Sequence, residues 1–402
     1  MELYAGYPFW LIKNPLFNYI HEVKENMQTD VAIIGSGITG ALVAHELCSH
    51  GIACAIFDKR AISTGSSAAS TAQLQYEIDV PLFRLLEKVE EKTALIAYRS
   101  SLQSITDIET LFRKTKIDAE FERKSSLFLA SDKKGCKDIK KEYLARKKYG
   151  LPVSLLEKEE LLHTYNIQRL GALRNEEAAE MDAYSGAVQL LQYHQRKNGL
   201  QLFPYTRIVR HEAAGNGFRL YAENGKMIRC RYLVIAAGYE AGQFLPKKVM
   251  DLISTYALVT EPMRPDQLWH EESQIWETAT PYFYLRTTKD NRIMMGGEDV
   301  PFKNESLRDA LLARKTKKLL EKFNALFPGI PVRCDMTWCG TFSATKDGLP
   351  YIGAYPGRDN MLFALGYGGN GITFSMIAAQ VIRNKLKGRK DEREAVFGFN
   401  RK

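Results

Sequence analysis

Hydrophobic and polar positions follow a strand pattern and then a helix pattern near the start of the chain. A β-branched apolar run from Asp30 ends in a glycine turn at residues 35–40, and apolar residues then recur at three- and four-residue intervals as far as Leu47. Gly51 ends the helical pattern, and residues 52–58 form a second apolar strand. The pattern predicts a strand–helix–strand unit with two parallel strands.

Similar patterns predict further elements along the chain. Helices are predicted over residues 82–114, 135–148, 185–199 and 305–327, strands over residues 121–131, 231–238, 254–260, 281–287, 292–297 and 361–365, a meander at 217–231, and a last helix to about 386. This order favours an α/β fold with a Rossmann-like GxGxxG domain and an interleaved α+β domain built on a mixed or antiparallel sheet.

The domain boundaries follow from where the nucleotide-type features lie. We assign residues 28–115, 151–246 and 335–402 to the GxGxxG domain, residues 116–150 and 247–334 to a substrate domain, and residues 1–27 to an N-terminal extension.

Composition and charge narrow the class of protein. The chain has 402 residues and a net charge of +9, but its densest basic stretches, 133–148 and 314–322, are diluted by acidic or apolar residues and are typical of solvated helix faces. We therefore expect no nucleic-acid partner, while an anionic substrate or a membrane surface stays open. No apolar run reaches the roughly 18–20 residues of a spanning helix, and no secretory signal is visible, so we expect a cytoplasmic protein without a transmembrane segment.

Cysteine and histidine spacing gives no metal signature. None of the six cysteines forms a CxxC pair, and the seven histidines show no HExxH or HxH arrangement. We expect reduced thiols and no metal site.

The glycine turn carries the first chemical motif. Gly35 permits a tight turn, Gly37 lets the backbone approach a pyrophosphate, and Gly40 allows close packing of helix on strand. Asp58 ends the second strand, where its carboxylate can accept hydrogen bonds from ribose hydroxyls. The unit predicts dinucleotide binding, and by itself leaves FAD and NAD open. The small and hydroxyl residues at 65–72 then suit either a backbone that lies against a large planar cofactor or a flexible loop.

Four later motifs identify a resemblance. They are Leu-Val-Ile-Ala-Ala-Gly at 233–238, a hairpin at 284–298 ending in Met-Met-Gly-Gly-Glu, Trp-Cys-Gly-Thr-Phe-Ser-Ala-Thr-Lys-Asp-Gly-Leu-Pro-Tyr-Ile-Gly at 338–353, and Gly-Tyr-Gly-Gly-Asn-Gly-Ile-Thr at 366–373. In this order they resemble the D-amino-acid oxidase family, in its glycine oxidase, sarcosine oxidase and γ-glutamylputrescine oxidase branch. The resemblance implies FAD and hydride transfer from a C–N carbon to flavin N5.

The motifs and the resemblance together give a set of expected cofactor-binding residues. In the family, a residue placed like Val209 lies against adenine, and N–H groups like those of residues 368–372 face the flavin. The full set is Gly35, Gly37, Ile38, Thr39, Gly40, Asp58, Lys59, Arg60, Ser66, Ser67, Ala68, Thr71, Ala72, Val209, Ala237, Gly238, Gly340, Gly366, Gly368, Gly369, Asn370, Gly371, Ile372 and Thr373.

The expected substrate residues lie on one strand and one neighbouring segment. Tyr282, Tyr284 and Arg286 alternate and therefore share a face, which is either a pocket wall, with Arg286 binding a carboxylate, or a face turned to solvent or helices. Phe342 stands where glycine-oxidase-like relatives carry a carboxylate-binding arginine. This departure favours an amine, or an amino acid bound differently, over a small free α-amino acid.

Two questions about the cofactor and the reaction accompany the resemblance. Some relatives attach FAD covalently, and Cys339 lies one position from that attachment site; we expect non-covalent FAD and an ordinary buried thiol. The expected reaction oxidises an amine or amino acid to an imine, with O₂ or another acceptor. The alternatives are a dehydrogenase that passes electrons to a quinone or protein, an NAD-dependent enzyme, and a non-catalytic FAD-binding protein.

Overall fold

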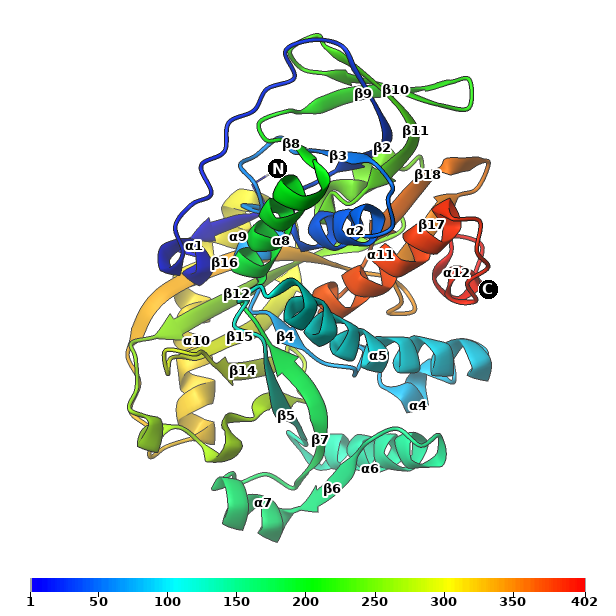
Figure 1. Ribbon diagram of the computed structural model, residues 1–402. Coiled ribbons are helices and arrows are strands. Elements are labelled where there is room, and N and C mark those ends of the chain that lie inside the picture. The colour runs from blue at the N-terminus through cyan, green and yellow to red at the C-terminus, as the bar shows by residue number, and fades with distance from the viewer. Residues whose placement is uncertain (1, 402) are drawn as a thin grey trace.

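Two β-sheets divide the chain, and each one is assembled from segments that are far apart in the sequence. The computed structural model describes residues 2–401. One sheet lies at the top of the view in Figure 1 and the other below it, with helices α2, α8 and α11 beside the first and α10 beside the second. The chain passes between the sheets several times, so neither is a continuous stretch of sequence.

The first sheet contains the predicted strand–helix–strand unit. Its order is β17-β18-β11-β2-β3-β8, with β10 on β11 and β9 on β10, and β18, β11, β2, β3 and β8 run parallel. The strands are β2 Met27–Ile34, β3 Cys54–Phe57, β8 Gln201–Phe203, β9 Ile208–Ala214, β10 Gly217–Ala222, β11 Met227–Ile235, β17 Tyr351–Tyr355 and β18 Arg358–Leu365. The apolar runs of β2 and β3 are buried because helices cover this parallel sheet.

The second sheet is mixed, as predicted, and mostly antiparallel. Its order is β1-β16-β12-β15-β14-β13-β5-β7-β4, with β6 on β7; β13 and β5 are the parallel pair. The strands are β1 Tyr4–Gly6, β4 Gln73–Leu74, β5 Glu122–Leu129, β6 Ser154–Glu157, β7 Gly171–Glu180, β12 Asp251–Thr260, β13 Gln274–Glu277, β14 Phe283–Thr287, β15 Ile293–Pro301 and β16 Cys334–Ala344.

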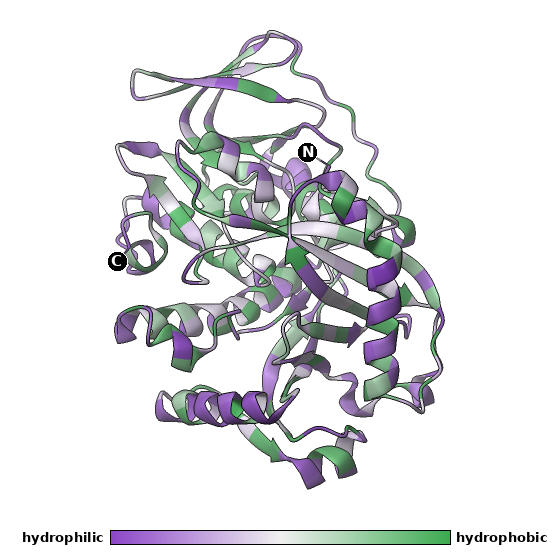
Figure 2. Ribbon diagram, turned by 180° about the vertical axis from the view of Figure 1, so that it is seen from behind, coloured by the Kyte–Doolittle hydropathy of each residue, from purple (hydrophilic) through white to green (hydrophobic). Residues whose placement is uncertain are grey.

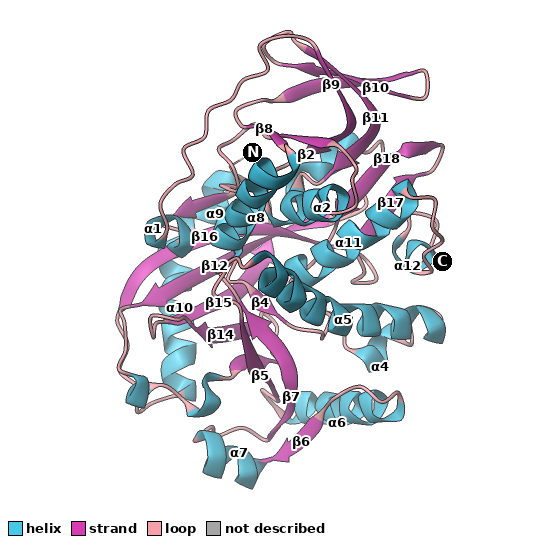
Figure 3. Ribbon diagram, viewed as in Figure 1, coloured by secondary structure: helices cyan, strands magenta, loops and turns pink. Residues whose placement is uncertain are grey.

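The helices lie outside the sheets and between them (Figure 3). Their bounds are α1 Phe9–Lys13, α2 Ile38–Cys48, α3 Ser66–Ala69, α4 Leu82–Leu85, α5 Glu91–Thr115, α6 Lys133–Lys148, α7 Lys158–Tyr165, α8 Ala183–Asn198, α9 Glu305–Ala310, α10 Leu312–Leu326, α11 Gly371–Leu386 and α12 Arg393–Phe397, with short 3-10 turns at Gly238–Phe244, Pro265–Gln267 and His270–Glu272. Two predicted helices are each split in two, at residues 86–90 and at Leu311.

The predicted domain boundaries differ from the sheets at four strands. Residues of β4, β6, β7 and β16 were assigned to the GxGxxG domain, yet all four strands belong to the second sheet. Strand β16 pairs with β12 from Thr260 to Asp251, so its hydrogen bonds tie it to that sheet. No strand was predicted from the sequence at any of these four segments, so their residues were assigned from the positions of the nucleotide-type features alone.

The N-terminal segment is part of the structure rather than an appendage. Strand β1 pairs with β16, and α1 follows it directly. Trp10 is fully buried, and its indole N–H donates to the carbonyl of Ser70 at 2.6 Å. The segment thereby closes one edge of the second sheet and packs on residues 66–70.

The helices show the polarity of a protein whose apolar side chains face inward. Hydrophilic residues mark the outer faces of α6 and α10 in Figure 2. No helix within residues 2–401 combines the length and the apolarity needed to cross a bilayer. The same residues contain no group of three or more His, Cys, Asp or Glu side chains placed to hold a metal ion.

Candidate active site

A first cavity of about 420 Å³ opens at the carboxyl ends of β2, β3 and β11. This edge of a parallel sheet is where open α/β folds place their ligands. The predicted residues that line it are Gly35, Gly37, Ile38, Thr39, Asp58, Lys59, Arg60, Ser66, Ser67, Val209, Ala237, Gly238, Gly366, Gly371 and Ile372.

Gly35 and Gly40 of the turn exclude a larger side chain for different geometric reasons. Gly35 has φ +110°, and a Cβ there would overlap the carbonyl oxygen of Ala236. Gly40 does not line the cavity; a Cβ there would overlap the carbonyl oxygen of Gly35. Gly40 therefore acts through the packing of α2 on the turn, not through contact with a ligand.

Asp58 is fixed at the end of β3. One carboxylate oxygen accepts hydrogen bonds from the N–H and hydroxyl of Ser36 at 2.8 and 2.7 Å, and the other accepts from the N–H of Arg60 at 2.9 Å. Burial raises the pKa of Asp58, and these hydrogen bonds oppose that rise because they stabilise the charged form. The carboxylate thus stays at the cavity wall as an acceptor.

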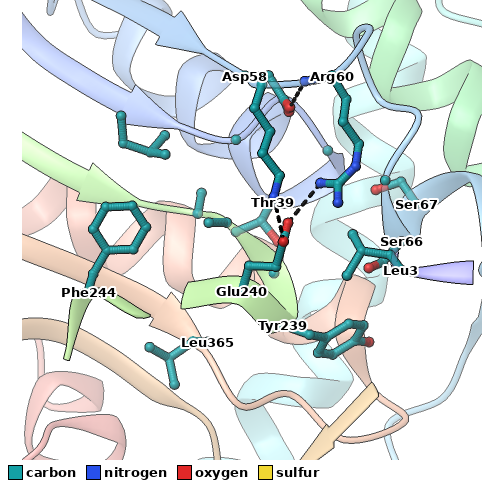
Figure 4. Close-up of a pocket in the computed structure, with 18 of the residues that line it drawn as sticks. Leu3, Thr39, Asp58, Arg60, Ser66, Ser67, Tyr239, Glu240, Phe244 and Leu365 are labelled. Atoms are coloured by element: carbon teal, nitrogen blue, oxygen red, sulfur yellow. Dashed lines mark hydrogen bonds and ion pairs between the residues drawn. The ribbon is translucent and has the colours of Figure 1, made fainter. Parts of the chain in front are cut away.

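The two predicted cationic residues beside Asp58 converge on a carboxylate that the sequence analysis missed. Lys59 Nζ lies 2.6 Å and Arg60 Nη1 lies 2.8 Å from the carboxylate oxygens of Glu240 (Figure 4). These contacts join the loop after β3 to the 3-10 turn after β11 and so hold the two sides of the first cavity together.

A second cavity, about 770 Å³, is lined largely by the second sheet. Strands β12, β15 and β16, the residues around β14, and the turn before α11 all contribute to it. The predicted residues that line it are Ser66, Thr71, Ala72, Tyr282, Tyr284, Gly340, Phe342, Gly368, Gly369, Asn370, Gly371 and Ile372.

The two cavities meet at a junction formed by six residues that line both: Leu3, Ser66, Ser70, Tyr239, Gly371 and Ile372. The hydroxyl oxygen of Ser66 is buried there and has no hydrogen-bond partner within the described residues. A buried hydroxyl without a partner fits a polar ligand that crosses the junction. An elongated dinucleotide with its phosphates at the glycine turn and its ring at the junction matches this shape.

Two tyrosines form one wall of the second cavity. The rings of Tyr282 and Tyr284 lie 5.7 Å apart between centroids, and the Tyr284 hydroxyl lies over Gly296 of β15, where a Cβ would overlap it. Burial raises the pKa of Tyr284 to about 12 and also raises the pKa of Tyr282. Both phenols are therefore neutral at physiological pH.

The prediction that Arg286 binds a substrate carboxylate is wrong. Arg286 is buried and lines neither cavity. Its guanidinium donates to the carbonyls of Thr287, Thr71, Ala72 and Met181 at 2.7–3.1 Å and lies 3.2 Å from the carboxylate of Glu180. It shares a strand face with Tyr284, as predicted, but residues 71–72 lie between it and the cavity.

The glycine-rich turn before α11 differs in part from its predicted role. The N–H of Gly368 donates to Ser343 O at 3.0 Å, that of Gly369 to the Asp79 carboxylate at 2.8 Å, and that of Asn370 to Tyr367 O at 3.2 Å. Of the five N–H groups expected to face the flavin, this leaves those of Gly371 and Ile372, which begin α11. Two other predicted residues, Ala68 and Thr373, are buried and line neither cavity.

Several lining residues were missed for identifiable reasons. Leu3 reaches both cavities only because β1 pairs with β16, which no local pattern indicates. Glu240 directly follows the predicted 233–238 motif, so its proximity to that motif was an available signal. Asp79 and Asp299 line the second cavity from a loop and from an irregular strand, where periodicity gives no side-chain direction.

Comparison with known proteins agrees with this geometry. The chain is 26% identical over 371 residues to glycine oxidase of Geobacillus kaustophilus, covering 89% of this chain and 93% of the relative. It is 23% identical over 381 residues to γ-glutamylputrescine oxidoreductase of Escherichia coli, covering 91% and 85%. The crystal structure of the Geobacillus glycine oxidase superposes with a TM-score of 0.80 at 23% identity, covering 93% of this chain and 99% of that one.

The family itself is given by a match to a family model. The model of the FAD-dependent oxidoreductase family DAO matches residues 30–384, from the first strand of the glycine-turn unit to the last turn of α11. This chain belongs to that family of FAD-dependent oxidoreductases.

Proposed function

We propose that this protein oxidises the C–N bond of an amine or amino acid to an imine, which water then hydrolyses. The observation that carries the proposal is the junction between the cavities. A dinucleotide held at the glycine turn reaches the second cavity there, opposite the wall of Tyr282 and Tyr284. The relatives glycine oxidase and γ-glutamylputrescine oxidoreductase support the same chemistry by their names.

In this reaction the protein binds and orients the substrate and excludes water from the site. FAD, when bound, accepts the hydride, and no side chain need attack the carbon. The phenol rings of Tyr282 and Tyr284 and the ring of Phe342 provide apolar walls for the substrate in the second cavity. The N–H groups of Gly371 and Ile372 and the positive end of α11 would favour the negative charge of reduced flavin, an effect of about 0.3–1 kcal/mol.

Anaerobic reduction of the bound flavin tests the proposal. We expect at least one member of a panel of amines and amino acids to bleach the flavin absorbance at about 450 nm, a property of the cofactor. Dithionite serves as the positive control. If dithionite bleaches the flavin and no panel member does, the proposed function is wrong and a binding role gains support. Repeating the positive reactions with O₂, and with a quinone analogue, then identifies the acceptor class.

We further propose that FAD is bound without a covalent link. None of the cysteines in residues 2–401 lines either cavity. Cys339 is buried on the face of β16 opposite Gly340, its thiol lies 3.4 Å from Asp309, and burial raises its pKa to about 11. We expect acid precipitation to release all of the flavin into the supernatant. Yellow colour that stays in the washed pellet would contradict this.

A further inference from the structure

We propose that Asp299 receives the proton of a cationic amine that carries no carboxylate beside its amino group. The inference rests on the proposed C–N oxidation and names the substrate class of the same site. It assigns to the second cavity a specificity that the Tyr282–Tyr284 wall does not provide.

A β-bulge directs Asp299 into the second cavity. Tyr256 pairs with Gly297 and Ser254 pairs with Val300, so Thr255 of β12 opposes two residues of β15, Glu298 and Asp299. Gly297 and Glu298 have φ of +125° and +57°. A bulge of this kind redirects side chains and is common beside active sites. As a result, Glu298 faces α10 while Asp299 lines the cavity.

Ionic contacts from α10 hold the bulge in place. The Glu298 carboxylate lies 3.0 Å from Lys315 Nζ and 2.8 Å from Lys322 Nζ. Lys315 Nζ also donates to the backbone carbonyl of Glu298 at 2.6 Å. A non-glycine residue with positive φ costs about 1–3 kcal/mol, so such a conformation persists only where the surroundings fix it. The direction of Asp299 is therefore built into the packing of α10 on the sheet.

Asp299 has an unused acceptor atom. Its Oδ1 is buried and has no hydrogen-bond partner within the described residues. The groups that face it are Thr255 of β12, Tyr282 before β14, and Asp79 of the loop before α4, while nearby Lys315 is engaged by Glu298. Burial first, and then the charge of Asp79, raises the pKa of Asp299 to about 7, and hydrogen bonds from Thr255 and Tyr282 to the carboxyl group oppose that rise. A buried carboxylate oxygen without a donor fits a cationic N–H group of a ligand.

The charge of the cavity lining points to the same substrate class. Six acidic residues line it: Glu77, Asp79, Asp132, Asp138, Glu277 and Asp299. Among the described residues, the cationic residues of the lining are Arg84 and Lys134, on α4 and α6. Three of the six carboxyl groups have a cation beside them: Asp138 lies 2.6 Å from Arg84, Glu77 lies 3.0 Å from Arg146, and Glu277 lies 3.9 Å from Arg169. Neither Phe342 nor the enclosed Arg286 supplies a guanidinium to this cavity. The carboxyl groups of Asp79, Asp132 and Asp299, which have no ion-pair partner among the described residues, favour an ammonium group over a carboxylate held next to it.

The proposed step balances in protons and electrons. The substrate ammonium gives one proton to the Asp299 carboxylate, which becomes a carboxylic acid, and the amine nitrogen regains its lone pair. The adjacent C–H bond then breaks, its hydrogen and two electrons leave as hydride for FAD, and the nitrogen lone pair forms the C=N bond. The product is an iminium ion, and Asp299 releases its proton to solvent in the next cycle.

Matched substrate pairs test the inference on the unmodified holoenzyme. The pairs are butylamine with norvaline, pentylamine with norleucine, and phenethylamine with phenylalanine. The members of each pair differ by one carboxylate, and each has a single amino group. We expect the amine of at least one pair to reduce the flavin on the order of 10- to 100-fold faster than its amino acid. Faster reduction by the amino acids would overturn the inference and leave the proposed function standing. No reduction by any amine or amino acid would refute both.

The variant Asp299→Asn tests the proton acceptor. We expect kcat/KM of the wild type for the better amine to rise as pH increases through about 7, because Asp299 must be ionised to take the proton. In Asp299→Asn this rise should be replaced by one that follows the pKa of the amine itself. Asp251→Asn, an exposed position on the same sheet, is the matched control, and FAD content checks folding. An unchanged pH profile in a flavin-loaded Asp299→Asn protein would overturn the role of Asp299.

Discussion

Replacing Gly40 with alanine is expected to leave the purified chain almost free of FAD. A Cβ at this position would overlap the backbone carbonyl oxygen of Gly35, and backbone atoms cannot move aside as a flexible side chain can. The start of α2 must then shift away from the turn that follows β2. Because the N–H groups of a helix start bind phosphate only at close range, even a small shift removes that contribution.

The measurement is the ratio of flavin absorbance to protein absorbance after purification, followed by titration with added FAD. We expect a loss of FAD affinity on the order of 100-fold or more, since both the phosphate contacts and the packing of α2 are disturbed. Gly329→Ala is the matched control, because a Cβ there meets no atom within 4 Å and its φ is ordinary. A flavin-replete Gly40→Ala protein would show that the turn tolerates the shift, and would remove the packing argument for this glycine.

The fold could be predicted from the sequence where a single hydrophobic periodicity extends over a whole helix or strand. The apolar run before Gly35 and the helical spacing after it gave β2, α2 and β3 with the correct parallel pairing. Pairing between distant strands was not predictable in the same way, because hydrogen-bond partners are chosen by the whole fold. Residues 335–344 were assigned to the GxGxxG domain although they form most of β16 in the second sheet, and the pairing of β16 with β1 was not foreseen.

The candidate site shows the same contrast between regular strands, which could be predicted, and long-range contacts, which could not. Alternation predicted that Tyr282, Tyr284 and Arg286 share a face, because a regular strand points every second side chain the same way, and it left open whether that face lines a pocket. Tyr282 and Tyr284 do line the second cavity. Alternation could not show that the long side chain of Arg286 ends at the carbonyls of residues 71–72. Alternation also did not predict that Asp299 lines the second cavity, because the bulge in β15 interrupts the regular alternation of side chains. Periodic sequence patterns predict which side chains share a face of a regular strand. The directions of Arg286 and Asp299 are set by contacts between distant segments, so only the three-dimensional structure gives them.

Arg286→Met should strongly destabilise the protein, because Arg286 supports the segment that lies between it and the cavity. The substitution leaves the carbonyls of Thr71, Ala72 and Met181 without this donor and leaves Glu180 without its nearest cation. Removing one partner of a buried ion pair typically costs about 3–5 kcal/mol. We expect a loss of that order in the free energy of unfolding, measured by urea denaturation, together with weaker FAD binding through residues 71 and 72.

The pH dependence of this loss distinguishes the ion pair from the packing. Burial raises the pKa of Glu180 to about 7 even with Arg286 present, and removal of the guanidinium raises that pKa further. The native state of Arg286→Met then holds a proton that the unfolded state releases above its ordinary carboxyl pKa, so its stability falls as pH rises. The wild type shows the same fall only up to about pH 7, so the loss of stability relative to the wild type should grow above about pH 7. In Arg286→Met/Glu180→Gln this fall should disappear and part of the stability should return, because no buried carboxylate is left unpaired. If Arg286→Met is destabilised equally at about pH 6 and at about pH 8, the effect comes from the lost carbonyl contacts alone.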